Sequence, residues 1–378
     1  MPNRKSTQRT KPLEEMKVAL VHYTASGVGG VEGVIAMHRA LLAAAVREVR
    51  VVARRGAADV LLKAKQPAGE LRTALHGCDA VFVHNVLTMP FDLPLAEALW
   101  QLAAETPEVR WVGWVHDLAA CNPDYDRAWH QPPWQRLAQA SPHFTYVAVS
   151  EHRARQFEAL TGAKARVIPN GIDVCAILGL GEPAWAFAKE HALLARDIVL
   201  IHPARLVRRK RIELSLEAAA ELRRRGRDAV ALITAAADPH NPAGAAYAGD
   251  LRARADALGL GDAAIFLHDG TARRSIPIAQ LYAMSDALIF PSREEGFGLP
   301  VLEAALQRLP VFCTDVEPLH SLLDRGIHVF APDASAAEIA TLIERTLDRS
   351  PAWRARREVL RRYSWETILR EHLAPLLA

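Results

Sequence analysis

Two glutamates, Glu295 and Glu303, stand eight positions apart with glycines between them. Pro300 lies between the two and suits the first turn of a helix, where its missing N–H costs nothing. Gly296 and Gly298 let the backbone approach a ligand closely, because they carry no Cβ. A carboxylate can accept two hydroxyl hydrogen bonds, which suits the diols of sugars and of ribose. The spacing therefore predicts a site for a hydroxyl-rich ligand.

This segment follows an apolar stretch, residues 287–290, that is typical of a buried strand. The turn that contains Phe297 then leads into a helix, whose free N–H groups near Leu299 can hold an anion or a sugar hydroxyl. The alternative is a plain strand–turn–helix with solvated glutamates. Two glycines combined with two glutamates favour the ligand site over that alternative.

A second segment gathers five basic residues within seven positions, directly after an apolar stretch at residues 198–201. They are Arg205, Arg208, Arg209, Lys210 and Arg211. Arginine binds phosphate through two parallel hydrogen bonds and lysine supplies a mobile point charge, so the segment suits a diphosphate. For Arg208, Arg209 and Arg211 a solvated basic loop is an equal alternative. A phosphate on a second substrate is a further candidate partner for one of these three.

The first half of the chain has a glycine-rich segment, residues 26–33, after an expected strand at residues 17–23. It is a candidate cradle for a phosphate or a sugar. A dinucleotide fingerprint would require an acidic residue about 20 positions later. Arg54 and Arg55 end the next strand instead, which disfavours a dehydrogenase.

Histidines follow several expected strands of this half. His116 comes after residues 111–115, while His22, His84 and Asn85 also lie at strand ends. Ligands of open α/β sheets bind at the carboxyl ends of the strands. His22, His84 and Asn85 are therefore candidates for an acceptor pocket, although a histidine satisfied within a loop is the plainer alternative.

The chain resembles the family 4 retaining glycosyltransferases of GT-B fold over roughly residues 17–370. The resemblance rests on the Glu295–Glu303 pattern with Gly-Phe-Gly inside it, and on an arginine and a lysine five positions apart. It implies that Glu295 meets the donor sugar and Glu303 the ribose hydroxyls. It also implies that Arg205 and Lys210 hold the diphosphate, and that His116 lies close to the donor sugar.

The same resemblance implies a catalytic set of His116, Glu295, Arg205 and Lys210. It implies a wider donor site: Gly29, Gly30, Arg205, Lys210, His268, Glu295, Gly296, Phe297, Gly298, Leu299 and Glu303. Within that set the backbone at His268 would meet the nucleobase, and Gly29 and Gly30 would close over the phosphates or the acceptor. Departures from the family pattern at residues 234–235 and 308–310 leave the donor open.

The 378 residues are too many for one ordinary core, and short apolar strands alternate with amphipathic helices. We expect an α/β protein of GT-B type, with two doubly wound Rossmann-like domains facing across a cleft. The acceptor-side domain would cover residues 16–178, and the nucleotide-sugar-binding domain residues 179–359. A C-terminal helix at about residues 360–378 would return to the first domain, and residues 1–15 would form a disordered tail.

The composition excludes several other classes. A net charge of +3 gives no overall argument for nucleic-acid binding, and four scattered cysteines suggest neither a zinc site nor disulfides. Asp124 and Asp126 resemble an Asp-x-Asp metal motif but lie in a proline-containing loop, so we expect no metal site and no required cofactor, with Mg²⁺ at most stimulatory. No stretch reaches the roughly 18 apolar residues of a membrane span. The expected location is the cytoplasm, and peripheral contact with the inner face of the membrane stays open.

The combined hypothesis is a bacterial, metal-independent, retaining glycosyltransferase. It would move a hexose, glucose or mannose, from a UDP- or GDP-linked donor to a hydroxyl of a small molecule, glycan or lipid. The alternatives are a GT-B phosphorylase or epimerase, or a nucleotide-sugar-binding protein without catalysis. The oligomeric state stays open.

Overall fold

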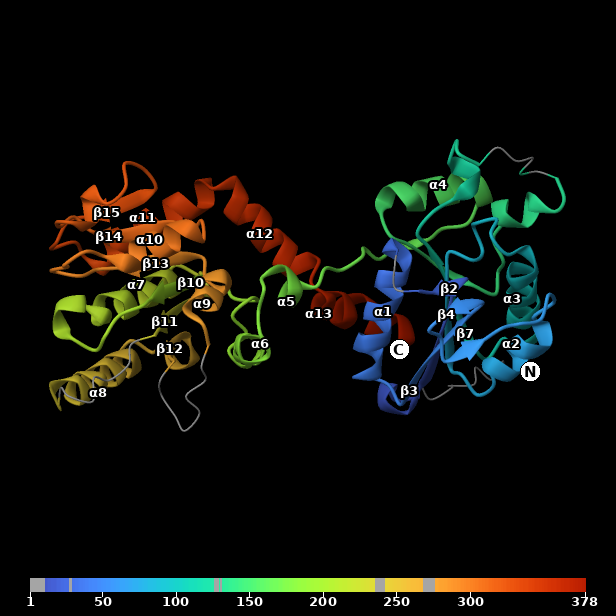
Figure 1. The fold of residues 1–378 in the computed structure, drawn as a ribbon, viewed down its shortest axis with the longest axis horizontal. Coiled ribbons are helices and arrows are strands. Elements are labelled where there is room, and N and C mark those ends of the chain that lie inside the picture. The colour runs from blue at the N-terminus through green and yellow to red at the C-terminus, as the bar shows by residue number, and fades with distance from the viewer. Residues whose placement is uncertain (1–10, 27–28, 126–128, 130, 235–241, 268–275) are drawn as a thin grey trace, which may run out of the picture. The chain divides into compact units, whose positions relative to one another are not determined.

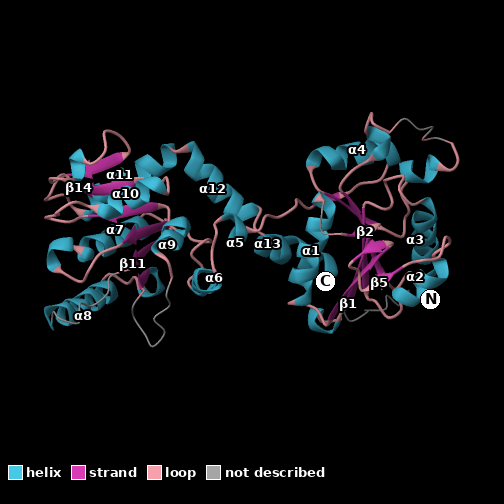
Figure 2. Cartoon of the chain, viewed as in Figure 1, coloured by secondary structure: helices cyan, strands magenta, loops and turns pink. Residues whose placement is uncertain are grey.

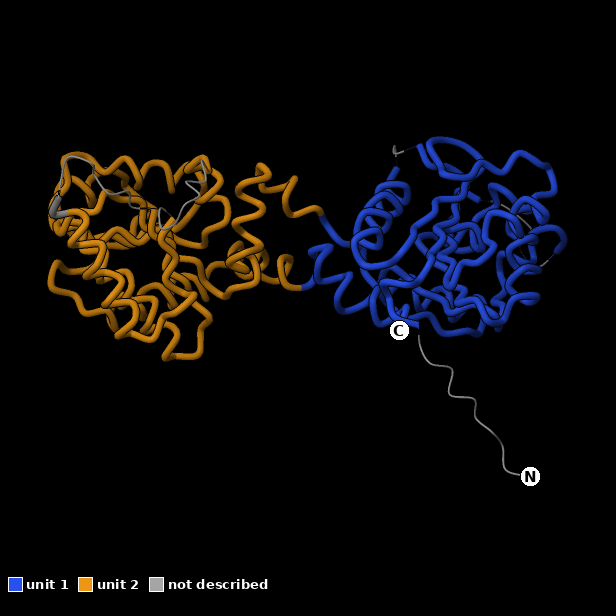
Figure 3. The backbone as a smooth tube through the Cα atoms, turned by 90° about the horizontal axis from the view of Figure 1, so that it is seen from below, with its two compact units in different colours: residues 1–172, 362–378 blue, residues 173–361 orange. Residues whose placement is uncertain are grey.

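The computed structural model describes residues 11–26, 29–125, 129, 131–234, 242–267 and 276–378. The chain forms two compact units (Figure 3). Unit 1 contains residues 1–172 and 362–378, and unit 2 contains residues 173–361. The sequence placed the two junctions a few residues away, after residue 178 and after residue 359.

Unit 1 combines helices with strands (Figure 2). Its main sheet is parallel and seven-stranded, with the order β5-β3-β1-β6-β7-β8-β9. Its strands are β1 Lys17–Val21, β3 Glu48–Ala53, β5 Val60–Leu61, β6 Ala80–His84, β7 Arg110–Val115, β8 Thr145–Ala148 and β9 Arg166–Val167. Two short strands, β2 Thr24–Ala25 and β4 Arg55–Gly56, pair beside it. Its α-helices are α1 Gly30–Ala43, α2 Ala68–Ala74, α3 Leu93–Glu105, α4 Glu151–Thr161, α13 Trp365–Ile368 and α14 Ala374–Leu377.

Unit 2 is built on a parallel six-stranded sheet with the order β12-β11-β10-β13-β14-β15 (Figure 1). Its strands are β10 Ile198–His202, β11 Ala229–Ile233, β12 Ala264–Phe266, β13 Ala287–Phe290, β14 Val311–Thr314 and β15 Ile327–Phe330. Its helices are α5 Val174–Ile177, α6 Glu182–Glu190, α7 Ile212–Arg224, α8 Pro242–Ala257, α9 Ile278–Met284, α10 Leu299–Leu306, α11 Ala336–Arg349 and α12 Pro351–Arg362.

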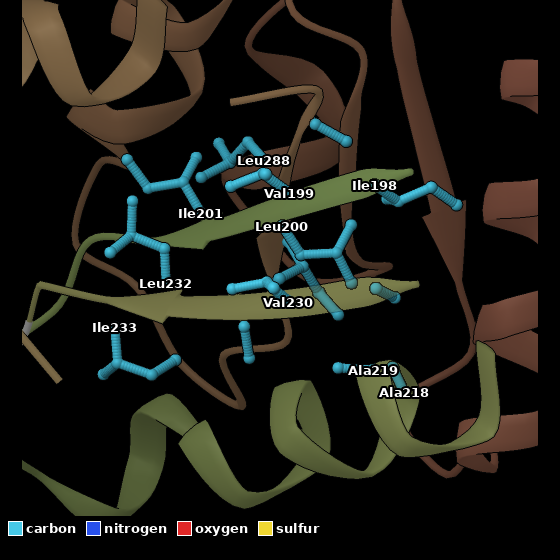
Figure 4. Packing of buried hydrophobic residues seen from close by; sticks show 14 of the residues in the cluster. Ile198, Val199, Leu200, Ile201, Ala218, Ala219, Val230, Leu232, Ile233 and Leu288 are labelled. Atoms are coloured by element: carbon cyan, nitrogen blue, oxygen red, sulfur yellow. The ribbon is translucent and has the colours of Figure 1, made fainter. Parts of the chain in front are cut away.

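The central strands of unit 2 are apolar at nearly every position, because helices cover both faces of a doubly wound sheet. Successive side chains of β10 point to opposite faces, so Leu200 lies toward α7 and Ile201 away from it (Figure 4). Ala218 and Ala219 of α7 are fully buried and let the helix pack closely on the sheet (Figure 4). The expectation of two parallel, doubly wound α/β domains is confirmed.

The C-terminal segment packs into unit 1, as expected. Trp365, Ile368 and Leu373 are buried in the same cluster as the side chains of β1 and β6. Gly171 makes room for this segment, since a Cβ there would meet the Trp365 ring 2.4 Å away. The segment is helical in three pieces, with a π-helical turn at residues 369–373 between α13 and α14.

The amino-terminal region holds more structure than the predicted tail of residues 1–15. Residues 1–10 lie outside the described part of the chain. Lys11, by contrast, forms an ion pair of 2.8 Å with Asp79, and residues 13–15 form one turn of 3-10 helix. In the part of the chain that the structure describes, no helix combines the length and the apolar character that a membrane span requires.

In both sheets the chain first adds strands toward one edge and then returns to the first strand and adds the rest toward the other edge, so the strand order reverses at one point. In unit 1 this point lies between β1 and β6, and in unit 2 between β10 and β13. Loops that leave these strands at their carboxyl ends diverge and open a crevice, which is where ligands of such sheets bind. Each unit therefore has one place in which a ligand site is expected.

Candidate active site

The glutamate segment lies at the reversal point of unit 2, directly after β13. Gly298 is the N-cap of α10 with φ +100°, a backbone conformation that favours glycine. A Cβ at this position would also lie 2.6 Å from Leu319 Cδ2. Pro300 occupies the first turn of α10, as predicted. The chain thus enters the helix by a turn that another residue would strain.

Lys210 and Glu295 meet across the reversal point, although 85 positions separate them in the sequence. Lys210 Nζ donates to Glu295 Oε1, and the two side chains are only 10% and 7% exposed. The ammonium group also lies 4.8 Å from the centre of the Phe290 ring. Burial lowers the pKa of Lys210, and the facing carboxylate opposes that change. The structure therefore joins two predicted donor residues in one buried ion pair.

The other basic residues of this loop differ in what they contact. Arg208 pairs with Asp250 at 2.5 Å, Arg209 donates to the Glu294 carbonyl at 2.7 Å, and Arg211 donates to the Pro332 carbonyl at 2.7 Å. Among the described residues, the exposed Arg205 side chain has no hydrogen-bond or ion-pair partner. Of the two residues that the resemblance assigned to the diphosphate, Arg205 is thus the one whose side chain is still available.

Glu303 is oriented by a residue that the sequence analysis missed. Tyr282 of α9 is buried and donates its hydroxyl to Glu303 Oε2 at 2.9 Å. Burial and this carboxylate raise the pKa of Tyr282, so the hydroxyl remains a donor. Nothing in the local sequence signals the contact, because α9 and α10 meet only in the fold.

At the reversal point of unit 1, four buried histidines lie side by side. His22 Nδ1 contacts the His84 carbonyl at 2.8 Å, and His84 Nδ1 contacts His116 Nε2 at 3.1 Å. His38, from α1, packs against His84 with ring centres 5.3 Å apart. Burial lowers the pKa of His38 and His116 to about 3, and it lowers the pKa of His22 and His84. All four are therefore neutral near pH 7.

The contact at His22 fixes the position of its proton. A carbonyl oxygen can only accept, so Nδ1 of His22 carries the hydrogen and Nε2 is left as an acceptor. Asn85 has φ +61°, and its Oδ1 accepts from the backbone N–H groups of His116 and Asp117 at 3.0 and 2.9 Å. Its Nδ2, which is left as a donor, has no partner within the described residues.

A cavity of about 620 Å³ opens at this point of unit 1. Its lining includes His22, Tyr23, Asn85, Phe91, Asp117 and Tyr125. A larger cavity of about 820 Å³ lies instead around residues 75–79 and 106–111, at the amino ends of β6 and β7. The smaller cavity is the candidate site, because ligands of such sheets bind at the carboxyl ends.

The predicted residues of unit 1 differ in their relation to this cavity. His22 and Asn85 line it, whereas His84 is fully buried and not part of its lining. His84 instead contacts the ring of His116. Gly29 is the N-cap of α1 and lies against the Glu32 carboxylate, which lines the cavity, and Gly30 is the first residue of that helix.

Two predictions concern residues that the structure does not describe. His268, assigned to the nucleobase, lies outside the described residues, as does Asp126 of the Asp-x-Asp pattern. Asp124 is exposed, and its backbone N–H donates to Asn122 Oδ1 at 3.0 Å. The predicted absence of a metal requirement stays a prediction.

The family model of glycosyl transferases group 1 matches residues 184–364. This part of the chain is similar to that family. The match contains Arg205, Lys210, Glu295 and Glu303, and so the whole of the site described in unit 2.

Two curated relatives match shorter segments. The alpha-D-kanosaminyltransferase of Streptomyces kanamyceticus is 32% identical over 161 residues, which are 42% of this chain and 39% of the relative. The O-antigen chain mannosyltransferase RfbU of Salmonella typhimurium is 34% identical over 87 residues, 23% of this chain and 24% of the relative. The matches thus span well under half of these relatives.

A solved structure from Anabaena, HepE in complex with UDP and glucose, has 19% sequence identity and a TM-score of 0.38. The match covers 96% of this chain and 99% of that one. A TM-score of this size supports no conclusion about the fold. The description of the fold is based on the strand orders given above.

Proposed function

We propose that the protein is a glycosyltransferase that moves a hexose from a nucleoside diphosphate sugar to an acceptor hydroxyl. The observation that carries the proposal is the buried Lys210–Glu295 pair at the reversal point of a group 1 glycosyltransferase domain. One partner suits a phosphate and the other suits sugar hydroxyls, so the pair brings the two parts of the donor to one place.

The donor would bind in unit 2, at the carboxyl ends of β10 and β13. Arg205 and Lys210 would contact the diphosphate, and the first turn of α10 would add backbone N–H groups. Glu295 would accept hydrogen bonds from the sugar, and Glu303, held by Tyr282, from the ribose. These contacts can stabilise the leaving diphosphate without a metal ion, because fixed positive charges need no reorganisation during the reaction.

The reaction would retain the configuration of the sugar, as the resemblance implies. The bond between the anomeric carbon and the phosphate oxygen breaks, and the acceptor oxygen bonds to that carbon on the same face. The acceptor proton passes to the leaving diphosphate. His116 would lie near the donor sugar, and the cavity of unit 1 would hold the acceptor. The mannosyltransferase relative favours mannose among the hexoses.

Thermal-shift titration with UDP, GDP and ADP, each with EDTA and with Mg²⁺, tests the donor site. A ligand at 100 times its Kd stabilises a folded protein by about 2.7 kcal/mol, or roughly 5–10 °C for a unit of this size. We expect one diphosphate to stabilise the protein equally well in EDTA. If none binds at millimolar concentration, the proposal fails, and a strict Mg²⁺ requirement would refute metal independence.

Arg205→Ala and Arg208→Ala form a matched pair for the same assay, because both arginines are exposed in one loop. Loss of a charged hydrogen bond is worth about 1.5–3 kcal/mol, so Arg205→Ala should weaken diphosphate binding about 10- to 100-fold. Arg208 already contacts Asp250 and the Tyr247 ring, so its loss should change binding little. Equal effects of the two variants would contradict the assignment of Arg205.

Product analysis completes the test. Proton NMR of the anomeric centre distinguishes retention from inversion. Formation of a sugar phosphate from inorganic phosphate would instead identify a phosphorylase, and turnover of the nucleotide sugar without an acceptor an epimerase. Tight diphosphate binding without turnover of any donor would leave a binding protein.

A further inference from the structure

The candidate acceptor cavity of unit 1 has an aromatic wall. Phe91 lies between Tyr23 and Tyr125, with ring centres 5.3 and 6.1 Å apart and steep interplanar angles of 83° and 68°. All three rings line the cavity. The Phe91 side chain is 59% exposed, which is unusual for a residue type that is mostly buried. A single exposed ring would need no explanation, but here three rings gather on one cavity.

The tyrosine at the base of this wall offers its ring and not its hydroxyl. Tyr23 Oη donates to backbone carbonyls, with the shortest distance of 3.0 Å to Met89. Burial raises the pKa of this phenol, so it stays protonated. The wall is therefore an apolar, polarisable surface, which is suited to the C–H face of a ring-shaped ligand.

Two polar side chains that line the cavity are uncharged. His22 leaves Nε2 as an acceptor, and Asn85 leaves the two hydrogens of Nδ2 as donors. An acceptor and a donor amide beside an apolar wall match a ligand that has hydroxyl groups at its edges and carbon at its face.

The charges that line the cavity largely cancel within the protein. Arg54 forms an ion pair of 2.6 Å with Asp92, and both side chains are mostly buried. Asp117 pairs with Arg153 at 2.9 Å. Two further residues of opposite charge, Glu32 and Arg55, also line the cavity. Taken together, the described residues that line the cavity carry no net positive charge. Among the described residues Arg55 is exposed and has no ion-pair partner, so it is the one lining cation that a phosphate or carboxylate could contact, and the lining carboxylates of Glu32 and Asp117 would repel such an anion.

We propose that this cavity binds an uncharged sugar ring as the acceptor. The ring would stack on Phe91, and its hydroxyls would meet His22 and Asn85. The inference rests on the proposed function and selects one acceptor class, a neutral glycan end, over phosphorylated acids and sugar phosphates. A lipid chain fits less well, because it would require a continuous apolar lining.

Saturation-transfer NMR on the full chain tests the proposal without requiring turnover. The probes are methyl α-D-mannopyranoside and methyl α-D-glucopyranoside, compared with mannose 6-phosphate, glucose 6-phosphate and glycerol 3-phosphate. We expect at least one methyl glycoside to bind at least tenfold more tightly than the 6-phosphate of the same sugar. Tighter binding of a phosphorylated probe, or no binding of either glycoside, would overturn the proposal.

Three variants assign the contact. Phe91→Ala should weaken glycoside binding about tenfold, since it removes the stacking surface. Phe91→Tyr should keep binding within about threefold of wild type. Leu61→Ala is the matched control, because Leu61 is an exposed apolar residue of the same unit that does not line the cavity. Unchanged binding in Phe91→Ala, or equal losses in Phe91→Ala and Leu61→Ala, would refute the role of the ring.

The proposed function is read separately in the same samples. Diphosphate binding would depend on residues of unit 2. If the wild-type protein binds no diphosphate, that result counts against the glycosyltransferase proposal. Normal diphosphate binding with preferred binding of phosphorylated acceptors would count only against the neutral-sugar acceptor.

Discussion

Replacement of Lys210 by methionine should destabilise unit 2 in a way that depends on pH. Methionine is close in length to lysine but lacks the charge, so Glu295 would lose its partner while still only 7% exposed. Removal of one partner from a buried ion pair costs about 3–5 kcal/mol, because the remaining charge stays in a medium of low polarity. For a unit of this size that corresponds to a melting temperature lowered by roughly 6–20 °C.

The sign of the pH dependence follows from proton uptake. A lone buried carboxylate takes up a proton in preference to staying charged. The folded variant then binds one more proton than its unfolded chain at neutral pH. Its unfolding free energy should therefore fall by about 1.4 kcal/mol for each unit that the pH rises between about 5 and 7, relative to wild type. The deficit is thus largest at pH 7 and shrinks in mild acid.

The assay is the difference in melting temperature between variant and wild type at pH 5, 6 and 7. Arg208→Met is the matched control, since Arg208 lies two positions away and pairs with Asp250 at the surface, with 71% and 58% exposure. Surface pairs of this kind contribute about 0–1 kcal/mol. The double variant Lys210→Met/Glu295→Gln should recover much of the lost stability, because no buried charge remains.

Two results would refute this reasoning. If Lys210→Met costs no more than Arg208→Met, the pair is not buried in solution. If its cost is large but does not change with pH, the loss reflects packing of the lysine side chain against Phe290 and not the charge of Glu295.

Two further predictions concern backbone strain and acid sensitivity. Gly298→Ala should lower stability by about 1–3 kcal/mol and weaken diphosphate binding, because alanine is strained at φ +100° and its Cβ would meet Leu319. Gly296→Ala is the control, because a Cβ at Gly296 has free space around it. Equal melting temperatures of the two variants would contradict this prediction. The buried histidines should make the protein acid-sensitive. Burial lowers the pKa of His38 and His116 to about 3 in the folded state, so below about pH 6.5 the unfolded chain binds protons that the folded chain does not. Each histidine therefore lowers the unfolding free energy by about 1.4 kcal/mol for each unit that the pH falls from about 6.5 toward 3. His38→Leu should therefore flatten the fall of melting temperature between pH 6.5 and 5, and an unchanged slope would count against a neutral buried His38.

The sequence predicted the central strands well because their signal is local. β13 begins and ends at the predicted residues, and β10 differs by one residue, since each is a short apolar run. β15, which lies at the sheet edge and is only partly buried, was missed. Helix α11 was also missed, although Ser335 and Glu338 form a capping box that marks its start.

The site could be predicted only where a motif was contiguous. The Lys210–Glu295 pair forms because β10 and β13 are neighbours in the sheet. The sequence does not show this, because β11 and β12 lie between them in the chain. Tyr282 has no motif and acts only through the packing of two helices. His84 was predicted to line the acceptor pocket, but side chains of a strand alternate between faces. It shares a face with Phe82, which belongs to the buried cluster that contains Trp114 and Trp365.

The two reversal points share one strand order but differ in charge, and that difference assigns their roles. Unit 2 presents Arg205 beside the Lys210–Glu295 pair, so an anionic diphosphate finds cations there. Unit 1 presents neutral His22 beside the exposed ring of Phe91, and the described residues that line its cavity carry no net positive charge, so a phosphate gains less there. A fold alone does not determine what binds to it. If the roles were exchanged, the diphosphate would lose the contacts that Arg205 and Lys210 offer, and this asymmetry is the strongest reason to place the donor in unit 2 and a neutral sugar in unit 1.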